Sequence, residues 1–396
     1  MKILPENITM IHVVSDWAHA RKDSEQCVMS ETLIYPPTDH FSLRAMAILF
    51  LHIAWHAEVP TSNLQTLPMI PLPTPSSLMR SDFEHIRSHQ YLIAPKNDGV
   101  RALLLIILKN GHETICVSIH RNGHVQDLSE RITFPLHHNI EGGSILDGEW
   151  MTHPDGSEEF VVFDAIAALG LSMRTALFSL RLVMAHACVR VLTTPPGLKI
   201  SVKKFIDPKE SPDEARNLLM SVLDSNGVDG LILAPMTDSI EAGRQHHYFK
   251  YKPLSVITID LKWDPLMKVL TCDDRSDGGD AELLVESAMP GITWIEQDFA
   301  DCCGGLWECF VRVVRRSEDR TPLFQITPKC LRTDKTRANS PFVIRRTCQN
   351  INENISVVDL LNLFGLTETN ADPVGHEFVA PPDSDVGHGP PVSVDR

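Results

Sequence analysis

Short apolar runs separated by turn-forming residues fill the chain from about residue 80 to 253. Runs of this kind, rich in Leu, Ile and Val and bounded by Gly, Pro, Asn or Asp, are typical of β-strands. Strands are expected at 91–95, 101–108, 115–120, 144–151, 160–167, 230–235 and 248–253. Helical character in this part of the chain is confined to 168–192 and 211–224. The pattern predicts a mixed α+β domain built largely on antiparallel sheet.

After residue 253 the pattern changes to short strands with little helical signal. Apolar runs at 255–263, 291–297, 306–314 and 322–330 favour a small β-barrel. Residues 355–365 have helical spacing, and the composition then becomes rich in Pro, Gly and Asp, which predicts disorder. The chain is therefore divided into an N-terminal extension with a Pro-rich linker (1–70), the α+β domain (71–253), the barrel domain (254–341), a helical segment that packs back on the α+β domain (342–366) and a disordered tail (367–396).

Composition narrows the class of protein. Of the 396 residues, 43% are hydrophobic and 22% are charged, which is typical of a soluble globular protein. The nine cysteines form no Cys-x-x-Cys pair, so reduced thiols in an intracellular protein are expected. The formal net charge of −15 argues against a surface that is basic overall, although a local site can still be basic.

Neither of the two long apolar stretches, 42–59 and 168–192, is expected to span a membrane. The first has roughly ten unbroken apolar residues where about twenty are needed, and the second contains three arginines. Both are predicted to be helices packed on a core. His52 and His56 have the spacing of two zinc ligands on a helix, but no third ligand follows them, so no structural zinc is expected.

Charged residues lie at the ends of several predicted strands. By the two-residue alternation of a strand, Asp147 and Glu149 share one face, and so do Lys250 and Lys252. Asp229 directly precedes an apolar strand. Each of these features alone would indicate a solvated strand edge or a turn. Their order along the chain is more informative.

Six short motifs follow one another. They are Lys96-Asn-Asp-Gly-Val-Arg101, Asp147-Gly-Glu149, Phe163-Asp164, Asp229-Gly230, Lys250-Tyr-Lys-Pro253 and Arg332-Thr-Asp-Lys335. In this order they resemble the covalent nucleotidyltransferase superfamily of mRNA capping enzymes and polynucleotide ligases. The resemblance runs from about residue 75 to 366. It implies a nucleotidyltransferase domain over 71–253, followed by a C-terminal OB-fold β-barrel domain over 254–341.

Details within the motifs resemble mRNA guanylyltransferases more than ligases. An aromatic residue separates the two lysines before Pro253, Thr-Ile-Asp follows at 258–260, and Trp-Glu-Cys occurs at 307–309. The last motif extends to Thr-Asp-Lys-Thr-x-x-Asn at 333–339. Ligases usually have Glu-Gly with a lysine four residues further on, whereas Asp229 stands here without such a lysine.

The implied reaction has two steps. The amine of Lys96 attacks the α-phosphate of GTP and releases pyrophosphate, and the lysine-bound GMP then passes to the 5′-diphosphate end of an RNA to form the GpppN cap. Covalent catalysis by lysine requires the neutral amine, which Lys250, Lys252, Arg101 and a bound metal would favour. The same cations would neutralise the triphosphate.

The resemblance assigns residues to three groups. Those implied in GTP binding are Asp98, Gly99, Arg101, Arg121, Glu149, Phe163, Lys203 and Ile232. Those implied in catalysis are Lys96, Lys250, Lys252, Arg332, Asp334 and Lys335. The carboxylates of Asp229 and Asp260 would hold Mg²⁺ or Mn²⁺, which are hard cations that prefer oxygen ligands.

Within the implied nucleotide site, Phe163 would stack on guanine opposite Ile232. Lys203 would contact the base edge, unless its neighbour Lys204 reaches the base instead. The last motif would reach the nucleotide only when the barrel domain closes about a hinge near 253–260. Such closure would orient pyrophosphate as the leaving group and exclude water.

One position departs from the family pattern. Capping enzymes often have Ile-Asp-Arg-x-Asn after the second strand, whereas this chain has His120 in place of the acid and keeps Arg121 and Asn122. The role of the missing carboxylate is therefore open. Arg121 is still expected on the phosphate side of the site.

Two other functions stay open at this point. An ATP-dependent DNA or RNA ligase would use the same Lys96 with AMP. A catalytically silent module would bind RNA ends or a polymerase partner, but every charged motif position is occupied, which disfavours it.

The implied partners follow from what the motifs leave out. No His-Cys-x5-Arg phosphatase motif occurs, and the first 70 residues are short for a triphosphatase or methyltransferase domain. The resemblance therefore implies a separate RNA triphosphatase, a cap methyltransferase and an RNA polymerase II tail as partners, besides the RNA 5′-diphosphate end. It implies the nucleus, or the cytoplasm for a viral enzyme that acts there.

Overall fold

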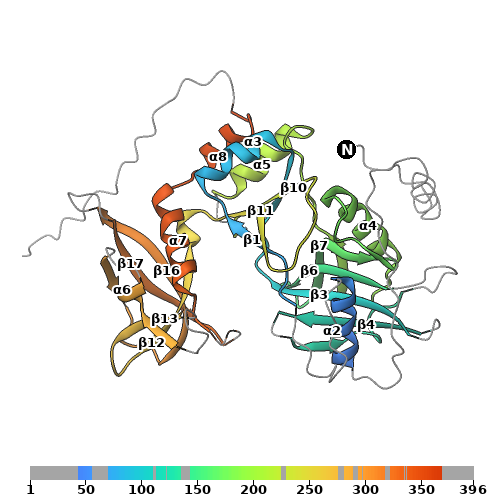
Figure 1. Cartoon of the computed structure of the whole chain (residues 1–396), viewed down its shortest axis with the longest axis horizontal. Coiled ribbons are helices and arrows are strands. Elements are labelled where there is room, and N and C mark those ends of the chain that lie inside the picture. The colour runs from blue at the N-terminus through green and yellow to red at the C-terminus, as the bar shows by residue number, and fades with distance from the viewer. Residues whose placement is uncertain are drawn as a thin grey trace, which may run out of the picture.

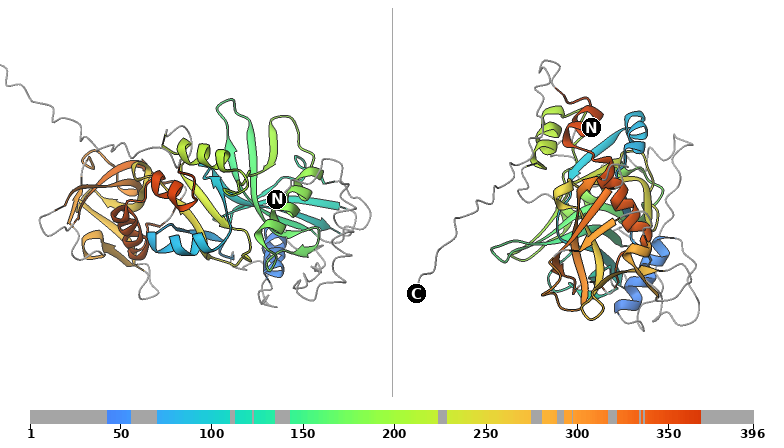
Figure 2. Two further views of the ribbon diagram at one scale, coloured as in Figure 1. Left: turned by 90° about the horizontal axis from the view of Figure 1, so that it is seen from above. Right: turned by 90° about the vertical axis from the view of Figure 1, so that its left-hand side faces the viewer.

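Figure 1 shows the computed structural model of the chain. The structure describes residues 43–55, 70–109, 113–121, 123–134, 143–223, 229–274, 281–288, 293–296, 298–316, 322–333, 335 and 337–367. Most of the N-terminal extension and all but the first residue of the predicted tail lie outside these ranges. Figures 1 and 2 show two lobes side by side along the longest axis, which we call the first and the second lobe.

The larger sheet of the first lobe has seven strands, in the order β5-β4-β3-β6-β7-β8 with β9 also on β7. All its pairs are antiparallel except that of β7 with β9. The strands are β3 (Val100–Lys109), β4 (Glu113–His120), β5 (Val125–Asp127), β6 (Ser144–Thr152), β7 (Glu158–Ala168), β8 (Leu171–Ser172) and β9 (Leu198–Val202).

Both faces of this sheet are covered, which explains why β3 is apolar at nearly every position. Leu103 and Leu105 pack in one cluster with helix α2 (Leu43–Ala54), whereas Leu104 and Ile106 pack in another with helix α4 (Phe178–Val191). Because successive side chains of a strand point to opposite faces, a strand covered on both sides is apolar throughout. The predicted packing of the apolar stretch around α2 on a core is confirmed.

The smaller sheet of the first lobe has the order β1-β11-β10-β2. Its strands are β1 (Thr74–Ser77), β2 (Tyr91–Pro95), β10 (Leu231–Pro235) and β11 (Arg244–Tyr251). Strands β2, β10 and β11 share a hydrophobic cluster with three helices, α3 (Phe83–Ser88), α5 (Pro212–Ser221) and α8 (Val357–Leu363). This helical group lies at the middle of the long axis (Figures 1 and 2). Two 3-10 turns accompany the sheet in sequence: η2 (Arg80–Asp82) lies between β1 and β2, and η3 (Leu254–Val256) follows β11.

The second lobe is a six-stranded sheet in the order β14-β13-β12-β16-β17-β15. Its elements are β12 (Thr258–Asp264), β13 (Val269–Asp274), β14 (Ala281–Leu284), α6 (Val285–Ala288), β15 (Thr293–Glu296), β16 (Gly305–Arg316) and β17 (Pro322–Leu331). Only β15 and β17 pair in parallel. Within the described ranges β14 and β15 do not pair with each other, so the sheet is not closed and the OB-fold barrel stays a prediction.

Helix α7 (Pro341–Glu353) joins the two lobes. Its Ile344, Cys348 and Ile351 are buried in the core of the second lobe. Its Asn350 Nδ2 donates a hydrogen bond of 2.6 Å to the carbonyl oxygen of Leu78 in the first lobe. The segment 342–366 therefore packs in two places, with α7 on the second sheet and α8 on the helices of the first lobe (Figure 1).

The helix predicted over 168–192 is wrong in its first ten residues. Residue Ala168 ends β7, and the chain returns as β8 through a tight turn at Leu169 and Gly170, whose φ angles are 52° and 81°. Glycine tolerates this left-handed conformation, which a helix cannot contain. The helix α4 begins at Phe178. No helix in the described part of the chain is long and apolar enough to cross a membrane.

Candidate active site

Lys96 and Asp229 meet where strand β2 ends and strand β10 begins. The two strands are antiparallel, and their backbone pairing continues past the last partners, because Lys96 N donates to Gly230 O at 2.9 Å. This pairing brings the side chains together, so that Lys96 Nζ lies 2.5 Å from Asp229 Oδ2. Both side chains are partly buried, with 24% of Lys96 and 18% of Asp229 exposed.

The same carboxylate also binds Lys252. The Nζ atom of Lys252 lies 2.9 Å from Oδ1 and 2.8 Å from Oδ2 of Asp229. This contact requires β10 and the end of β11 to approach closely at Gly230, whose φ is 136° and where a Cβ atom would strike the carbonyl oxygen of Tyr251. The Asp-Gly pair therefore provides a carboxylate followed by the residue that allows the strands to approach.

Lys250 is the third lysine of this group and lies opposite Ile232 in the pairing of β10 with β11. Burial lowers the pKa of Lys250 to about 8, and nearby positive charges act in the same direction. In order of decreasing effect these charges are Lys252, Lys96, Arg121 and Lys335. Within the described residues the side-chain amine of Lys250 has no hydrogen bond or ion pair, so it is available to an anionic ligand.

Arg101 and Phe163 form the opposite wall of the site. Arg101, on β3, donates two hydrogen bonds to Asp147 on β6, at 3.0 Å and 2.5 Å. Its guanidinium carbon lies 5.2 Å from the centre of the Phe163 ring, and Lys203 Nζ lies 5.6 Å from it. The aromatic ring of β7 is therefore flanked by two cations.

Lys203 faces this ring, whereas its neighbour Lys204 does not. Lys203 is 7% exposed and its Nζ donates to Pro95 O at 3.1 Å, beside Lys96. Burial lowers the pKa of Lys203 to about 8, although the carboxylate of Glu149 opposes the shift. Lys204 instead forms an ion pair with Glu214 on the surface.

Glu149 and Gly99 are also in contact. Gly99 N donates to Glu149 Oε1 at 3.3 Å. A Cβ atom on Gly99 would strike the backbone carbonyl oxygen of Trp150, so only glycine fits here. Asp98 is exposed in the same loop, and Arg121 is exposed in the turn after β4.

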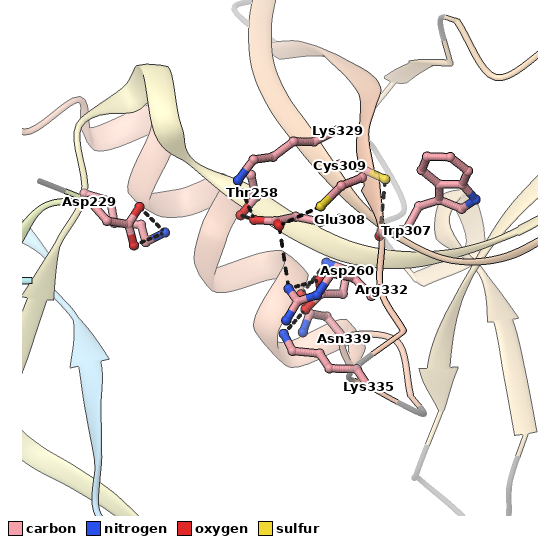
Figure 3. Close-up of polar contacts among 12 residues, drawn as sticks. Asp229, Thr258, Asp260, Trp307, Glu308, Cys309, Lys329, Arg332, Lys335 and Asn339 are labelled. Carbon is pink, nitrogen blue, oxygen red and sulfur yellow. Dashed lines mark hydrogen bonds and ion pairs between the residues drawn. The ribbon is translucent and has the colours of Figure 1, made fainter. Parts of the chain in front are cut away.

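The last motif lies on the second lobe and forms a separate polar cluster (Figure 3). Asp260, on β12, accepts hydrogen bonds from Arg332 Nη1 at 3.1 Å and from Lys335 Nζ at 2.5 Å. Asn339 pairs with the backbone of Asp260 in both directions, at 2.8 Å and 2.7 Å. Asp334 lies outside the described residues.

The two carboxylates predicted to share a metal ion are not brought together. Figure 3 shows Asp229 well apart from the cluster around Asp260, and each oxygen of Asp260 binds a cation of its own lobe. The described residues contain no group of three or more His, Cys, Asp or Glu that could hold a metal ion. Mg²⁺ commonly binds through one or two carboxylates plus substrate phosphates, and Asp229 fits that arrangement once a nucleotide is present.

Two buried ion pairs of the site do not follow from the sequence pattern. Alternation places Asp147 on one face with Glu149, yet Asp147 is fully buried against Arg101. Arg181 is 0% exposed and binds both oxygens of Asp164, at 2.7 Å and 3.0 Å, and the hydroxyl of Tyr248 at 2.6 Å. An arginine within an apolar helix was the available signal for the second pair.

Arg181 thereby connects two parts of the site. Asp164 follows Phe163 on β7, and Tyr248 precedes Lys250 by two residues on β11. Because both strands bind one guanidinium, Arg181 fixes the distance between the strand that carries Phe163 and the strand that carries Lys250. The contact is buried, so water does not compete with it.

Comparisons with known structures give low similarity. A Lig E DNA ligase is 17% identical, with a TM-score of 0.32, over 67% of this chain and 100% of the ligase. Mycobacterial DNA ligase D complexed with ATP is 14% identical, with a TM-score of 0.36, over 69% and 97%. The ATP-dependent DNA ligase of bacteriophage T7, complexed with ATP, is 12% identical, with a TM-score of 0.35, over 66% and 98%. Similarity at this level does not assign a function.

The comparison with protein families is decisive for the first lobe. Residues 56–254 match the model of the mRNA capping enzyme catalytic domain, which is half of the chain. The matched region contains Lys96, Asp229, Lys250 and Lys252, the residues that the fold brings together. The chain therefore belongs to the mRNA capping enzyme family of covalent nucleotidyltransferases.

Proposed function

We propose that this chain is an mRNA guanylyltransferase, which transfers GMP from GTP through a lysine adduct to the 5′-diphosphate end of RNA. The observation that carries the proposal is the contact of Lys96 with Asp229, beside Lys250 on β11 and Lys252 just after that strand. A nucleophilic amine, a carboxylate that can take its proton and cations for the phosphates are the groups that this chemistry requires.

In the first step, Lys96 Nζ forms a bond to the α-phosphorus while the bond from that phosphorus to the bridging oxygen of pyrophosphate breaks. The proton of Lys96 passes to Asp229 Oδ2, which already lies 2.5 Å away. Lys250 and Lys252 stabilise the negative charge on the phosphate oxygens. Once Asp229 has lost that proton, its carboxylate would hold Mg²⁺ or Mn²⁺, which would add positive charge beside the phosphates.

Phe163 supports recognition of the base. Its ring is half-buried on β7 and would stack on guanine, with Ile232 of β10 on the opposite face. Lys203 would contact the base edge, because it lies 5.6 Å from the ring centre while Lys204 points to the surface. Arg101 and Glu149 lie opposite each other on β3 and β6 and would bind the ribose.

The second lobe, which we propose to be an OB-fold domain, would act in the first step and reopen for the second. Closure about the chain crossing near 253–260 would bring Arg332 and Lys335 to the leaving pyrophosphate, and reopening would admit RNA. A terminal phosphate oxygen of the RNA then forms a bond to the phosphorus of the adduct while the bond from that phosphorus to Lys96 Nζ breaks, and the leaving amine takes back the proton held by Asp229. RNA triphosphatase, cap methyltransferase and the RNA polymerase II tail are the expected partners in the nucleus.

A labelling experiment tests the proposal. The protein is incubated with α-labelled GTP or ATP and Mg²⁺, denatured and examined for label on the polypeptide. We expect label from GTP that is lost in Lys96→Ala, is released by acid but not by alkali, and moves to RNA with a 5′-diphosphate end. Label from ATP alone would instead identify a ligase, and no label from either nucleotide would reject covalent transfer.

A further inference from the structure

Glu308, in the middle strand β16 of the second lobe, has no role in the proposed reaction so far. It accepts hydrogen bonds from donors on both neighbouring strands (Figure 3). Thr258 Oγ1 on β12 lies 2.8 Å from Oε1, and Lys329 Nζ on β17 lies 3.2 Å from the same oxygen. Cys330 Sγ, also on β17, lies 3.4 Å from Oε2. Three donors on two strands hold this carboxylate in one orientation.

The contacts keep Glu308 ionised. Burial raises its pKa, but the hydrogen bonds from its three donors outweigh that effect, so that the pKa lies below the ordinary value of a glutamate. The side chain is 16% exposed. A carboxylate that is charged, ordered and largely shielded from water can orient a neighbouring cation.

Arg332 is that cation. Its Nη1 lies 3.1 Å from Asp260 Oδ1 and 3.7 Å from Glu308 Oε2, so one guanidinium nitrogen is held between two carboxylates. The backbone of Arg332 is also fixed, because its N–H donates to the carbonyl oxygen of Leu306 at 2.8 Å. The direction of this guanidinium is therefore set by Asp260 on one side and Glu308 on the other.

Thr258 connects the same carboxylate to the crossing between the lobes. It is the first residue of β12 and follows the η3 turn at Leu254–Val256, where the chain leaves the first lobe. A rotation of the second lobe about this crossing would move Thr258, Glu308 and Arg332 together. Lys335 of the last motif has an electrostatic effect on the first lobe, since its charge lowers the pKa of Lys250.

We propose that Glu308 is a positioning residue for the first step, which orients Arg332 toward the leaving pyrophosphate as the second lobe closes. This inference rests on the proposed nucleotidyl transfer. Glu308 touches no substrate in this arrangement and acts through Arg332 alone. Its removal should therefore slow adduct formation without affecting the transfer of GMP from a finished adduct to RNA.

The variant Glu308→Gln tests this role, because it removes the charge and keeps the shape of the side chain. At saturating GTP we expect the maximal rate of adduct formation to fall about tenfold, because a misplaced charge-stabilising group costs rate. KM for GTP and the single-turnover transfer from purified adduct to RNA should change by no more than about twofold. If the nucleotide that labels the protein is ATP, the same measurements are made with ATP.

A double-mutant cycle with Arg332→Ala separates positioning from a merely structural role. If Glu308 acts through Arg332, then Glu308→Gln should slow the Arg332→Ala protein by no more than about twofold. An additional tenfold loss in that background, an equal loss in transfer to RNA, or a wild-type rate for Glu308→Gln would each overturn the inference.

Two further variants test whether a loss of rate comes from the lost contact or from misfolding. Thr258→Val removes one donor to Glu308 and leaves its charge, and we expect a loss of about threefold in the first step only. Glu159→Gln is the matched control, since Glu159 is 15% exposed and binds Lys199 and Ser201 at the edge of the first lobe. It should keep the wild-type rate. Absence of any label on the wild-type protein would reject the proposed function itself, and the role of Glu308 with it.

Discussion

The carboxylate of Asp229 lies 2.5 Å from the amine of Lys96, at the junction where β2 ends and β10 begins. The same carboxylate binds Lys252, so one acidic side chain orients two amines. A residue in this position can place the nucleophile, receive its proton and later bind a divalent cation with the phosphates.

The variant Asp229→Asn should slow adduct formation by about a hundredfold, because Lys96 loses both its orienting partner and its proton acceptor. Stability should change little, since Asp229 is partly exposed. Rapid-quench labelling with α-labelled GTP measures the rate, and thermal unfolding provides the control. A rate within about threefold of wild type would contradict the role of Asp229.

Lys250→Met should make the protein more stable at pH 7 and much less active. Burial lowers the pKa of Lys250 to about 8 from an ordinary value of 10.5. Below pH 8 the lysine is charged in the folded and unfolded chain, and its burial destabilises the fold. Between pH 8 and pH 10.5 Lys250 is neutral in the folded chain and charged in the unfolded chain. The folded chain then binds fewer protons, so the unfolding free energy of the wild type rises with pH.

The stability advantage of Lys250→Met should therefore shrink as the pH rises from about 8 and vanish near 10.5. Adduct formation should fall about a hundredfold at pH 7, because a phosphate-stabilising cation is lost. Thermal unfolding across this range measures the first effect. Lys204→Met, on the surface, is the control. If the stability advantage of Lys250→Met grew with pH, the lowered pKa of Lys250 would be rejected.

Gly230→Ala should disrupt the site through the backbone. Its φ of 136° is strained for alanine, and the added Cβ would strike Tyr251 O. We expect a loss of about 2 kcal/mol in unfolding free energy and a larger loss of adduct formation, because Asp229 would shift from Lys96. Gly156→Ala is the matched control, since its φ of 82° is also left-handed but a Cβ there meets nothing within 4 Å. Equal effects of the two substitutions would contradict this explanation.

Arg181→Met should leave Asp164 buried without a cation. Breaking a buried ion pair in this way typically costs about 3–5 kcal/mol, because one charge stays uncompensated. Urea unfolding measures the loss, and the double variant with Asp164→Asn should recover part of it. A single-variant loss below about 1 kcal/mol would show that the pair does not carry this energy.

Much of the fold and the centre of the site could be predicted from the sequence. Apolar runs bounded by turn residues located β3, β6 and β10, because these strands pack against helices. The order of the motifs singled out Lys96 and Lys250 as catalytic and Asp229 as a metal ligand, and the fold places Asp229 on Lys96 itself. Local composition alone was not sufficient, since each of these residues by itself would indicate a solvated strand edge.

Other features depend on contacts between distant segments. The partner of Arg101 is Asp147, although Arg101 lies directly opposite Glu149 in the strand pairing, and alternation alone does not reveal this. Helices α7 and α8 are both amphipathic, yet α7 buries its apolar face in the second lobe and α8 in the first. A hydrophobic pattern specifies a buried face but not the surface that covers it.

The influence of Lys335 on Lys250 has a consequence for the order of events. Lys250 and Lys335 carry like charges on separate lobes, so in the empty protein their interaction opposes closure of the lobes. On the proposed function, a bound triphosphate would neutralise both charges and favour closure. Release of pyrophosphate would restore the repulsion and favour reopening before RNA binds.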